Sequence, residues 1–108
     1  MKLYQGIPPH TVLVLPTKTS SRPLPLCLDV RNHSQTGFSW GYLGSGPAQL
    51  ALAICVDAVG RERALDVYQG FKLRLIAQLP GDQPWMLTEH DVRTAIAVIE
   101  GQLRGVTP

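Results

Sequence analysis

The stretch GFSWGYLGSGPAQLALAI, residues 37–54, decides the fold of this chain. It sets four glycines, three aromatic residues and a proline directly before a run that is almost wholly apolar. Pro47 suits the start of a helix, because its φ is already helical and it has no N–H to leave unpaired there. Asp57 is the only polar residue among the ten that end at Val59. The pattern therefore predicts a helix over 47–59 that is buried on nearly all sides, in the centre of the core.

Flanking residues predict where this helix begins and ends. Gly46 is expected to be its cap, and Gln49, three residues later, is expected to reach back to a free N–H. Gly60 is expected to end the helix, since glycine is favoured just past a helix C-terminus.

Two more helices are predicted downstream from apolar residues at helical spacing. The first covers 62–78 and stops before the sequence Pro-Gly-Asp at 80–82. The second covers 89–104, and Thr88 with Asp91 three residues later resembles a capping box at its start.

The first third of the chain predicts strands. Apolar runs at 1–7 and 11–15, together with alternating patterns at 24–30 and 38–42, predict up to four short strands. The polar segment 17–22 is expected to be a loop. Strands followed by helices indicate an α+β fold, a small antiparallel sheet of three or four strands with three helices packed on it.

Composition limits the organisation and the function class. The 108 residues predict a single domain, 1–108, strand-rich over 1–43 and helical over 44–104. A net charge of +2 with dispersed basic residues argues against a nucleic-acid binder. No apolar stretch reaches the ~18 residues that span a bilayer, and no signal peptide is recognisable, so we expect a cytoplasmic protein without membrane association. Cys27 and Cys55 are then expected to be reduced thiols.

The glycine-rich loop before the first helix predicts either an anion site or a tight turn. A helix N-terminus offers free N–H groups and the positive end of the helix dipole. The loop is not a phosphate-binding P-loop, because Pro47 and Ala48 stand where lysine and a hydroxyl residue are needed. It also lacks the third small residue of a dinucleotide fingerprint and the glycines that flank a nucleophile elbow around Ser45. The alternative is that the glycines only let the chain turn sharply and let the buried helix approach the sheet.

Aromatic and charged residues near the loop leave further alternatives. Phe38, Trp40 and Tyr42 alternate, which predicts one shared side of a strand, either packed in the core or facing a planar ligand ring. Lys72 falls within the apolar arc of its helix, either with its stem along the core or as a positioned cation. Asp57 needs a partner if it is buried, and Lys72 or an arginine is expected to supply it.

No catalytic or metal-binding constellation is recognisable. His10, His33 and His90 are isolated and lack the spacing of metal ligands, so no metal site and no cofactor are expected. Asp29 and His33 are close enough in sequence to meet across a turn, although a solvated histidine is the simpler expectation. The sequence therefore favours a protein that is not an enzyme.

Three segments, GFSWGYLGSGPAQLALAI, ALDVYQGFKLRLIAQLP and WMLTEHDV, resemble a family of small uncharacterised proteins of bacteria and their phages. The resemblance extends over most of the chain and carries no activity with it. It implies that ten residues belong to the family pattern: Trp40, Gly41, Tyr42, Gly44, Ser45, Gly46, Pro47, Gln49, Lys72 and Trp85. By analogy with small phage proteins that interfere with host defence, it implies a host protein or a sequestered signalling nucleotide as partner.

Together these patterns favour a non-enzymatic module that binds a small anionic, nucleotide-like ligand at the loop and the helix N-terminus. The expected ligand-binding residues are Trp40, Gly41, Tyr42, Gly44, Ser45, Gly46, Gln49 and Lys72. The alternative is a protein-interaction module or an inhibitor of a host protein. The oligomeric state is left open by the sequence.

Overall fold

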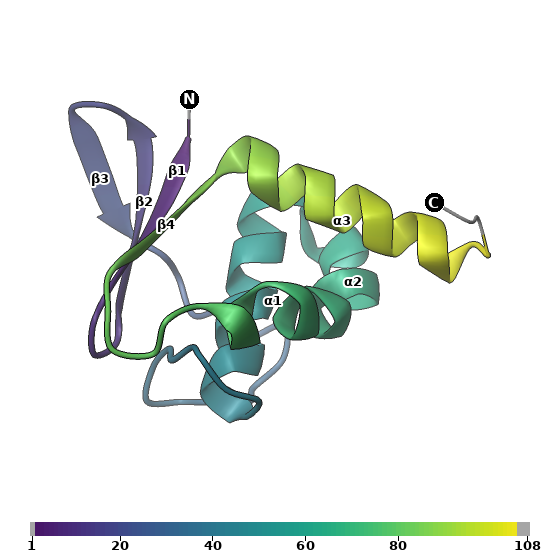
Figure 1. Cartoon of the computed structure of the whole chain (residues 1–108), viewed down its shortest axis with the longest axis horizontal. Helices are drawn as coiled ribbons and strands as arrows, with labels where there is room; N and C mark the ends of the chain where they lie inside the picture. The colour runs from purple at the N-terminus through teal and green to yellow at the C-terminus, as the bar shows by residue number, and fades with distance from the viewer. Residues whose placement is uncertain (1, 106–108) are drawn as a thin grey trace.

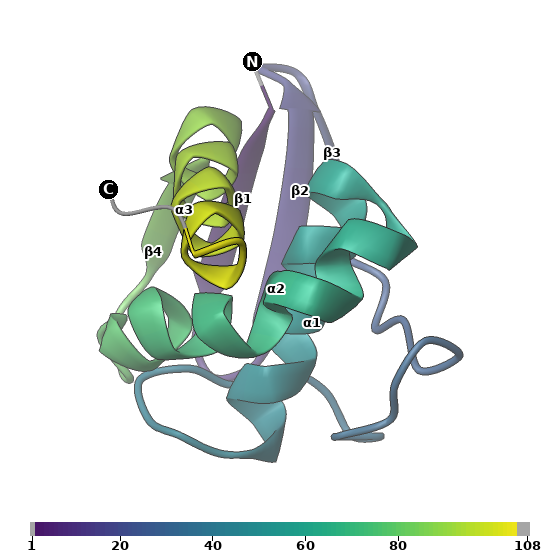
Figure 2. The same ribbon diagram turned by 90° about the vertical axis from the view of Figure 1, so that its right-hand side faces the viewer.

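The computed structural model describes residues 2–105. Four strands and three α-helices follow in the order β1–β2–β3–α1–α2–β4–α3, with a 3₁₀ turn, η1, after α2. Their bounds are β1 Leu3–Ile7, β2 Thr11–Thr17, β3 Ser20–Pro23, α1 Ser45–Val59, α2 Arg61–Arg74, η1 Ile76–Gln78, β4 Trp85–Thr88 and α3 Glu89–Leu103. All three helices lie on one face of the sheet (Figures 1 and 2). The predicted α+β fold with a small antiparallel sheet is confirmed.

The sheet has the strand order β3-β2-β1-β4, and every neighbouring pair is antiparallel. β1 and β2 form a hairpin in which Tyr4 lies opposite Val14. β4 comes from the second half of the chain and adds to the free edge of β1, where Trp85 lies opposite Gly6. One strand from beyond two helices therefore completes a sheet that the N-terminal segment begins.

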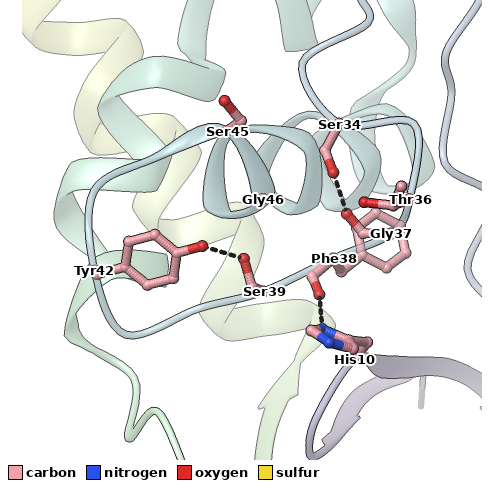
Figure 3. A pocket seen from close by; sticks show the side chains of 9 residues that line it. All are labelled: His10, Ser34, Thr36, Gly37, Phe38, Ser39, Tyr42, Ser45 and Gly46. Carbon is pink, nitrogen blue, oxygen red and sulfur yellow. Dashed lines mark hydrogen bonds between the residues drawn. The ribbon is translucent and has the colours of Figure 1, made fainter.

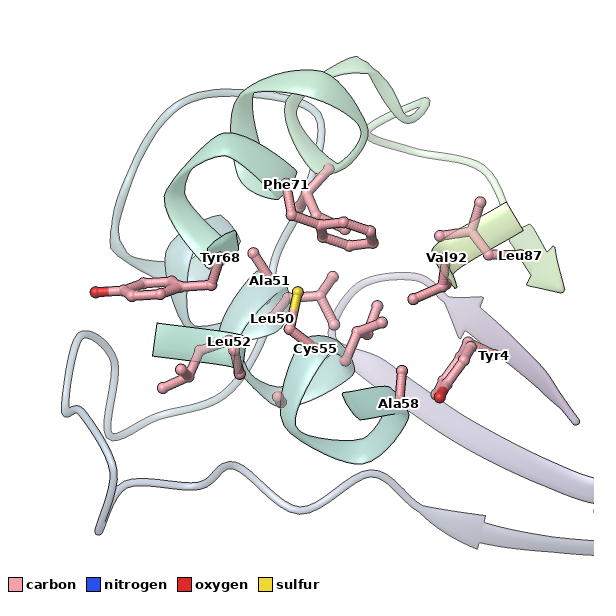
Figure 4. Close-up of a cluster of buried hydrophobic side chains, with 14 of the residues drawn as sticks. Tyr4, Leu50, Ala51, Leu52, Cys55, Ala58, Tyr68, Phe71, Leu87 and Val92 are labelled. Atoms are coloured by element: carbon pink, nitrogen blue, oxygen red, sulfur yellow. The ribbon is translucent and has the colours of Figure 1, made fainter. Parts of the chain in front are cut away.

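Helix α1 is at the centre of the core, as its apolar run predicts. Leu50, Leu52 and Ile54 are completely buried. In Figure 4 their helix lies between Phe71 of α2 and Tyr4 of β1, with side chains from all three elements in one cluster. Buried side chains therefore surround most of α1 instead of forming one stripe, as expected for a helix that is covered on nearly all sides.

Helices α1 and α3 begin and end within two residues of the prediction, whereas α2 ends at Arg74, four residues before the predicted end at 78, and the 3₁₀ turn η1 follows it. Thr88 accepts a hydrogen bond from the Asp91 N–H at 2.9 Å, and the Asp91 carboxylate accepts one from the Thr88 N–H at 3.1 Å. This capping box is confirmed and fixes the start of α3. Gly60 follows the last residue of α1 and has φ +87°, a backbone conformation that favours glycine. This conformation lets the chain turn sharply into α2.

The strand predictions are correct at β1 and β2 and wrong elsewhere. Residues 24–30 form no strand, because Pro25 interrupts the run and Cys27 has φ +60°. Residues 38–42 form none either, since the Gly41 N–H bonds to the Ile76 carbonyl instead of a neighbouring strand. The third strand, β3, lies partly within the segment 17–22 that was expected to be a loop, and β4 was not predicted.

A charged cluster joins the sheet to α1. The Asp57 carboxylate accepts hydrogen bonds from Lys2 Nζ at 3.0 Å, Tyr4 Oη at 2.8 Å and an Arg22 guanidinium nitrogen at 2.8 Å. Burial alone would raise the pKa of Asp57, but these three donors together hold it below its ordinary value. Asp57 therefore has an arginine partner as expected, and Lys2, not Lys72, is its lysine partner.

Candidate functional site

Two adjoining hollows lie beside the loop that leads into α1. The first has a volume of about 480 Å³ and is lined by His10, Ser34, Thr36, Gly37, Phe38, Ser39, Tyr42, Ser45 and Gly46 (Figure 3). The second has a volume of about 530 Å³ and is lined by Pro8, Pro9, His10, Ser39, Trp40, Gly41, Tyr42, Gly81 and Asp82. His10, Ser39 and Tyr42 line both, so the two hollows adjoin along the loop, and together they are termed the groove.

The N-terminus of α1 supplies unpaired donors to the first hollow. Gly44 is the cap residue and makes no side-chain cap bond. The Ala48 N–H bonds to the Gly44 carbonyl at 3.0 Å, and Pro47 has no N–H. The N–H groups of Ser45 and Gly46 therefore remain without a partner inside the helix, as the first N–H groups of any helix do. No acidic residue lies in the first turn to compete for them.

Hydroxyl and imidazole groups line the same hollow. Ser39 Oγ and Tyr42 Oη are 2.8 Å apart, and Ser34 Oγ donates to the Gly37 carbonyl at 2.8 Å. His10 Nδ1 lies 2.9 Å from the Phe38 carbonyl and donates to it, which leaves Nε2 free for another partner. Of the described residues that line this first hollow, none is an acid, so an anion would meet no negative side chain in it.

Close contacts explain two of the loop glycines. Gly41 has φ +87°, and a Cβ there would lie 2.8 Å from the Cα of Gly81 and 2.9 Å from the Leu79 carbonyl oxygen. A Cβ on Gly46 would lie 1.8 Å from Ser39 Oγ. These two glycines are required by the approach of neighbouring backbone and side chains. The Cβ of any residue at position 44 would meet only the ring of Tyr42, at 2.6 Å, which is exposed and able to move.

Trp40 anchors the loop to the sheet. Its ring packs edge-to-face against Trp85 of β4, with centroids 5.5 Å apart and an interplanar angle of 85°. Both side chains are buried, and neither indole N–H has an acceptor among residues 2–105. Such aromatic pairs contribute about 0.5–1.5 kcal/mol beyond their buried area. The predicted shared side for the three aromatics is wrong for Tyr42, because Phe38 and Trp40 are buried while the Tyr42 side chain is 52% exposed.

Gln49 has a different role from the one predicted. Helix α1 begins two residues earlier than expected, so Gln49 lies beyond the third helical residue, from which a side chain could reach back to the cap. Its side chain is completely buried. Its amide nitrogen donates to the carbonyls of Leu26 and Arg31, and its oxygen accepts from the N–H groups of His33 and Ser34. All four hydrogen-bonding positions of this amide are therefore occupied by the segment that precedes the loop. The expected bond back to the helix start is absent.

Lys72 and the Asp29–His33 pair also differ from expectation. Lys72 is half-buried on α2 and lines neither hollow. Asp29 forms an ion pair with Arg61 on the surface. His33 Nε2 instead lies 2.8 Å from Tyr68 Oη. Asp29 and His33 therefore do not meet as an acid–base pair.

Sequence reasoning missed the residues outside the central motif that complete the groove. His10, Ser34, Thr36 and Asp82 come from turns and loops before and after the motif. Their polar character is a signal only once the fold brings these segments together. No group of three or more His, Cys, Asp or Glu residues within 2–105 is placed to bind a metal ion. The same residues include no helix with the length and apolar character needed to cross a membrane.

A family model described as a family of unknown function, DUF6166, matches residues 7–98. The chain belongs to this family. The matched range contains the whole glycine-rich loop, all of α1 and α2, and β4. Comparison with curated proteins gives no match, and comparison with solved structures gives none either.

Proposed function

We propose that this DUF6166 protein is a non-enzymatic module that binds a small anionic, nucleotide-like ligand in the groove along residues 38–46. The observation that carries the proposal is the pair of free N–H groups, of Ser45 and Gly46, at a helix N-terminus that opens into a hollow without acidic residues. The positive end of the helix dipole adds to the attraction for a phosphate.

The phosphate end of the ligand is assigned to the first hollow. The two N–H groups, the Ser39 and Tyr42 hydroxyls and His10 Nε2 all belong to residues that line this hollow, which has room for one phosphate. Hydrogen bonds to a charged acceptor are about twice as strong as those between neutral groups. A phosphate therefore has more to gain here than a neutral ligand of the same size.

The ring end of the ligand is assigned to the second hollow. Pro8, Pro9 and the exposed ring of Tyr42 offer flat apolar surface against which a planar base can stack. Asp82 lies in the same hollow and is an acceptor for an amino group or a sugar hydroxyl. Its negative charge also opposes a phosphate at this end, so the ligand is expected to bind in one direction.

Calorimetry with inorganic phosphate and with mono-, di- and cyclic nucleotides tests the proposal. Ser45→Asp places a carboxylate in the first turn of α1, which stabilises the helix by about 0.3–1 kcal/mol. The same carboxylate should weaken binding of phosphate and of nucleotides by about a hundredfold, because two unit charges about 6 Å apart near a protein surface repel by about 2.8 kcal/mol. Ser45→Asn is the neutral control of equal size, and thermal unfolding checks the fold of each variant.

Tyr42→Ala distinguishes the two ends of the ligand. Loss of the stacking surface should weaken nucleotide binding by about 1–3 kcal/mol beyond the effect of Tyr42→Phe, which keeps the ring and removes only the hydroxyl assigned to the phosphate. If wild-type protein binds no nucleotide and no phosphate at millimolar concentration, or if Ser45→Asp binds as tightly as Ser45→Asn, the proposal fails.

A second candidate function is a protein-interaction module, an inhibitor of a host protein. It is favoured by Tyr42 and Leu43, which are 52% and 61% exposed at the tip of the loop. Adjacent exposed apolar side chains on a loop are typical of a protein contact. The resemblance to proteins of bacteria and their phages gives both candidates the same proposed setting, a conflict between phage and host, with either a signalling nucleotide or a host protein as the target.

A further inference from the structure

Strands β1 and β2 carry apolar residues on both faces. The sequence of β2 begins Thr-Val-Leu-Val-Leu, and β1 reads Leu-Tyr-Gln-Gly-Ile. An antiparallel sheet with one solvated face normally alternates apolar and polar residues, whereas a continuous apolar run is typical of a strand covered on both sides. The sequence of these two strands therefore indicates that both faces of the sheet are covered.

The structure covers only one of the two faces. Tyr4, Val12 and Val14 point towards the helices and are buried. Their neighbours along the strands point the other way and form what we term the outer face: Leu3, Gln5, Ile7, Leu13, Leu15 and Met86. In both Figure 1 and Figure 2 the helices lie on the opposite side of the sheet. Ile7 is 39% and Met86 51% exposed, whereas Leu3, Gln5, Leu13 and Leu15 are half-buried among their neighbours on the sheet.

The outer face has Gln5 at its centre and two further uncharged polar residues, Thr11 and Thr88, at its margins, opposite Ile7 and Leu3. Gln5 lies at its centre, opposite Leu13 on one side and Met86 on the other. Leu3 precedes it and Ile7 follows it on the same face of β1. None of the six residues is charged, although charged residues make up 17% of the chain. A contiguous apolar surface of this kind marks an interaction site in a folded protein.

We propose that the outer face binds the outer face of a second copy of this chain, in a two-fold symmetric dimer. A two-fold interface brings each patch against itself, so a patch that carries charge of one sign repels its own copy. The outer face is uncharged and has no such penalty. The Gln5 amide is both donor and acceptor, so two copies of it are complementary across a two-fold axis through the centre of the face. Interfaces between identical chains are also the more apolar class.

The size of the face predicts a weak, reversible dimer. Three strands, β1, β2 and β4, about 4.8 Å apart and about five residues long give a face of roughly 14 by 17 Å. This is close to 240 Å² in projection, whereas a stable interface of standard size buries about 800 Å² per partner. The dimer is therefore expected to form with rising protein concentration and to dissociate on dilution.

Sedimentation equilibrium over a concentration series, from about 5 to 500 µM, tests the proposal. The weight-average mass of wild-type protein should rise from that of one chain towards that of two. Gln5→Glu and Gln5→Lys each place like charges opposite one another and should remain monomeric at 500 µM. An equimolar mixture of the two variants should recover the dimer, because opposite charges then meet across the axis. Gln69→Glu, at an exposed position of α2, is the matched control and should behave as wild type.

Circular dichroism of each variant confirms that the fold is retained, which is expected because Gln5 is a half-buried polar residue on a strand surface. A wild-type protein that stays monomeric at 500 µM overturns the proposal and leaves the outer face for a different partner. Dimerisation of Gln5→Glu at the wild-type concentration also overturns it. A mixture of the two charged variants that stays monomeric overturns the two-fold arrangement around Gln5.

Discussion

Replacement of Gln49 by methionine tests how strongly one buried amide organises the segment beside the groove. Methionine has nearly the same length and volume as glutamine, so the change removes the amide and leaves the packing volume similar. In the native protein this amide bonds to four backbone groups between residues 26 and 34, at distances of 2.6–3.0 Å. Ser34, one of the four partners, also lines the first hollow.

The expected loss of stability follows from these four bonds. A typical hydrogen bond contributes about 1 kcal/mol net, and a buried group left without a partner costs about 1–3 kcal/mol. The segment around these groups is partly exposed, so water can reach some of them after the amide is removed. We therefore expect Gln49→Met to lower the free energy of unfolding by about 3–4 kcal/mol, a large share of the ~5–15 kcal/mol typical of a domain.

Urea unfolding followed by far-ultraviolet circular dichroism measures this loss. Gln69→Met is the control, because Gln69 is exposed on α2 and its loss should change the free energy of unfolding by less than about 0.5 kcal/mol. Amide hydrogen exchange adds a local reading, in which the His33 and Ser34 N–H groups should lose protection. A loss below about 1 kcal/mol with an unchanged m-value would refute the anchoring role of Gln49.

Three further substitutions test other parts of the structure. The pKa of Asp57 is lowered in the folded protein, so its contribution to stability is present above the unfolded-state pKa near 4 and is lost as the pH falls below that value. In acid-unfolding curves, Asp57→Asn should therefore lose less stability than wild type between about pH 5 and 2. An unchanged pH dependence in this variant would contradict the role of Asp57. Gly41→Ala should destabilise by at least ~1–2 kcal/mol because of its positive φ and the contact with Gly81, whereas Gly101→Ala, with open space around it inside α3, should be neutral or stabilising by up to about 1 kcal/mol in the same thermal-unfolding assay.

The helices were predictable because their signals are local. Thr88 and Asp91 lie three residues apart and satisfy each other, so the start of α3 follows from adjacent sequence. The apolar run of α1 predicts burial on all sides wherever the helix is placed in the fold. In α1 only the first two residues were missed, because Ser and Gly at 45 and 46 are not typical helix residues. In α2 the predicted helix ran four residues too far, because the 3₁₀ turn η1 continues the helical spacing.

The strands were less predictable because their pairing is not local. β3 reads Ser-Ser-Arg-Pro and is exposed along its whole length, so no apolar alternation marks it. It forms because it pairs with β2 in a hairpin, and its Arg22 side chain binds Asp57 of helix α1. β4 is only four residues long and depends on the edge of β1, which lies some eighty residues earlier in the sequence.

The site was predictable in its centre and not at its margins. Gly41, Gly46, Ser45 and Tyr42 line the groove, as the motif indicates, whereas Gly44 lines neither hollow. Gln49 belongs to the same motif but is turned inward, and a single sequence cannot distinguish a buried amide that holds a loop from one that faces a ligand. His10 enters the groove from the turn between β1 and β2, and nothing local to that turn predicts it.

The edge-to-face contact of Trp40 and Trp85 has a practical consequence for spectroscopy. These are the two tryptophans of the chain, so its intrinsic indole fluorescence comes from one junction between the loop and β4. Trp40 also lines the second hollow. The emission of the unlabelled protein thus reports on the opening of this junction and on occupancy of the groove, and a rearrangement confined to the far ends of α2 and α3 would leave it unchanged.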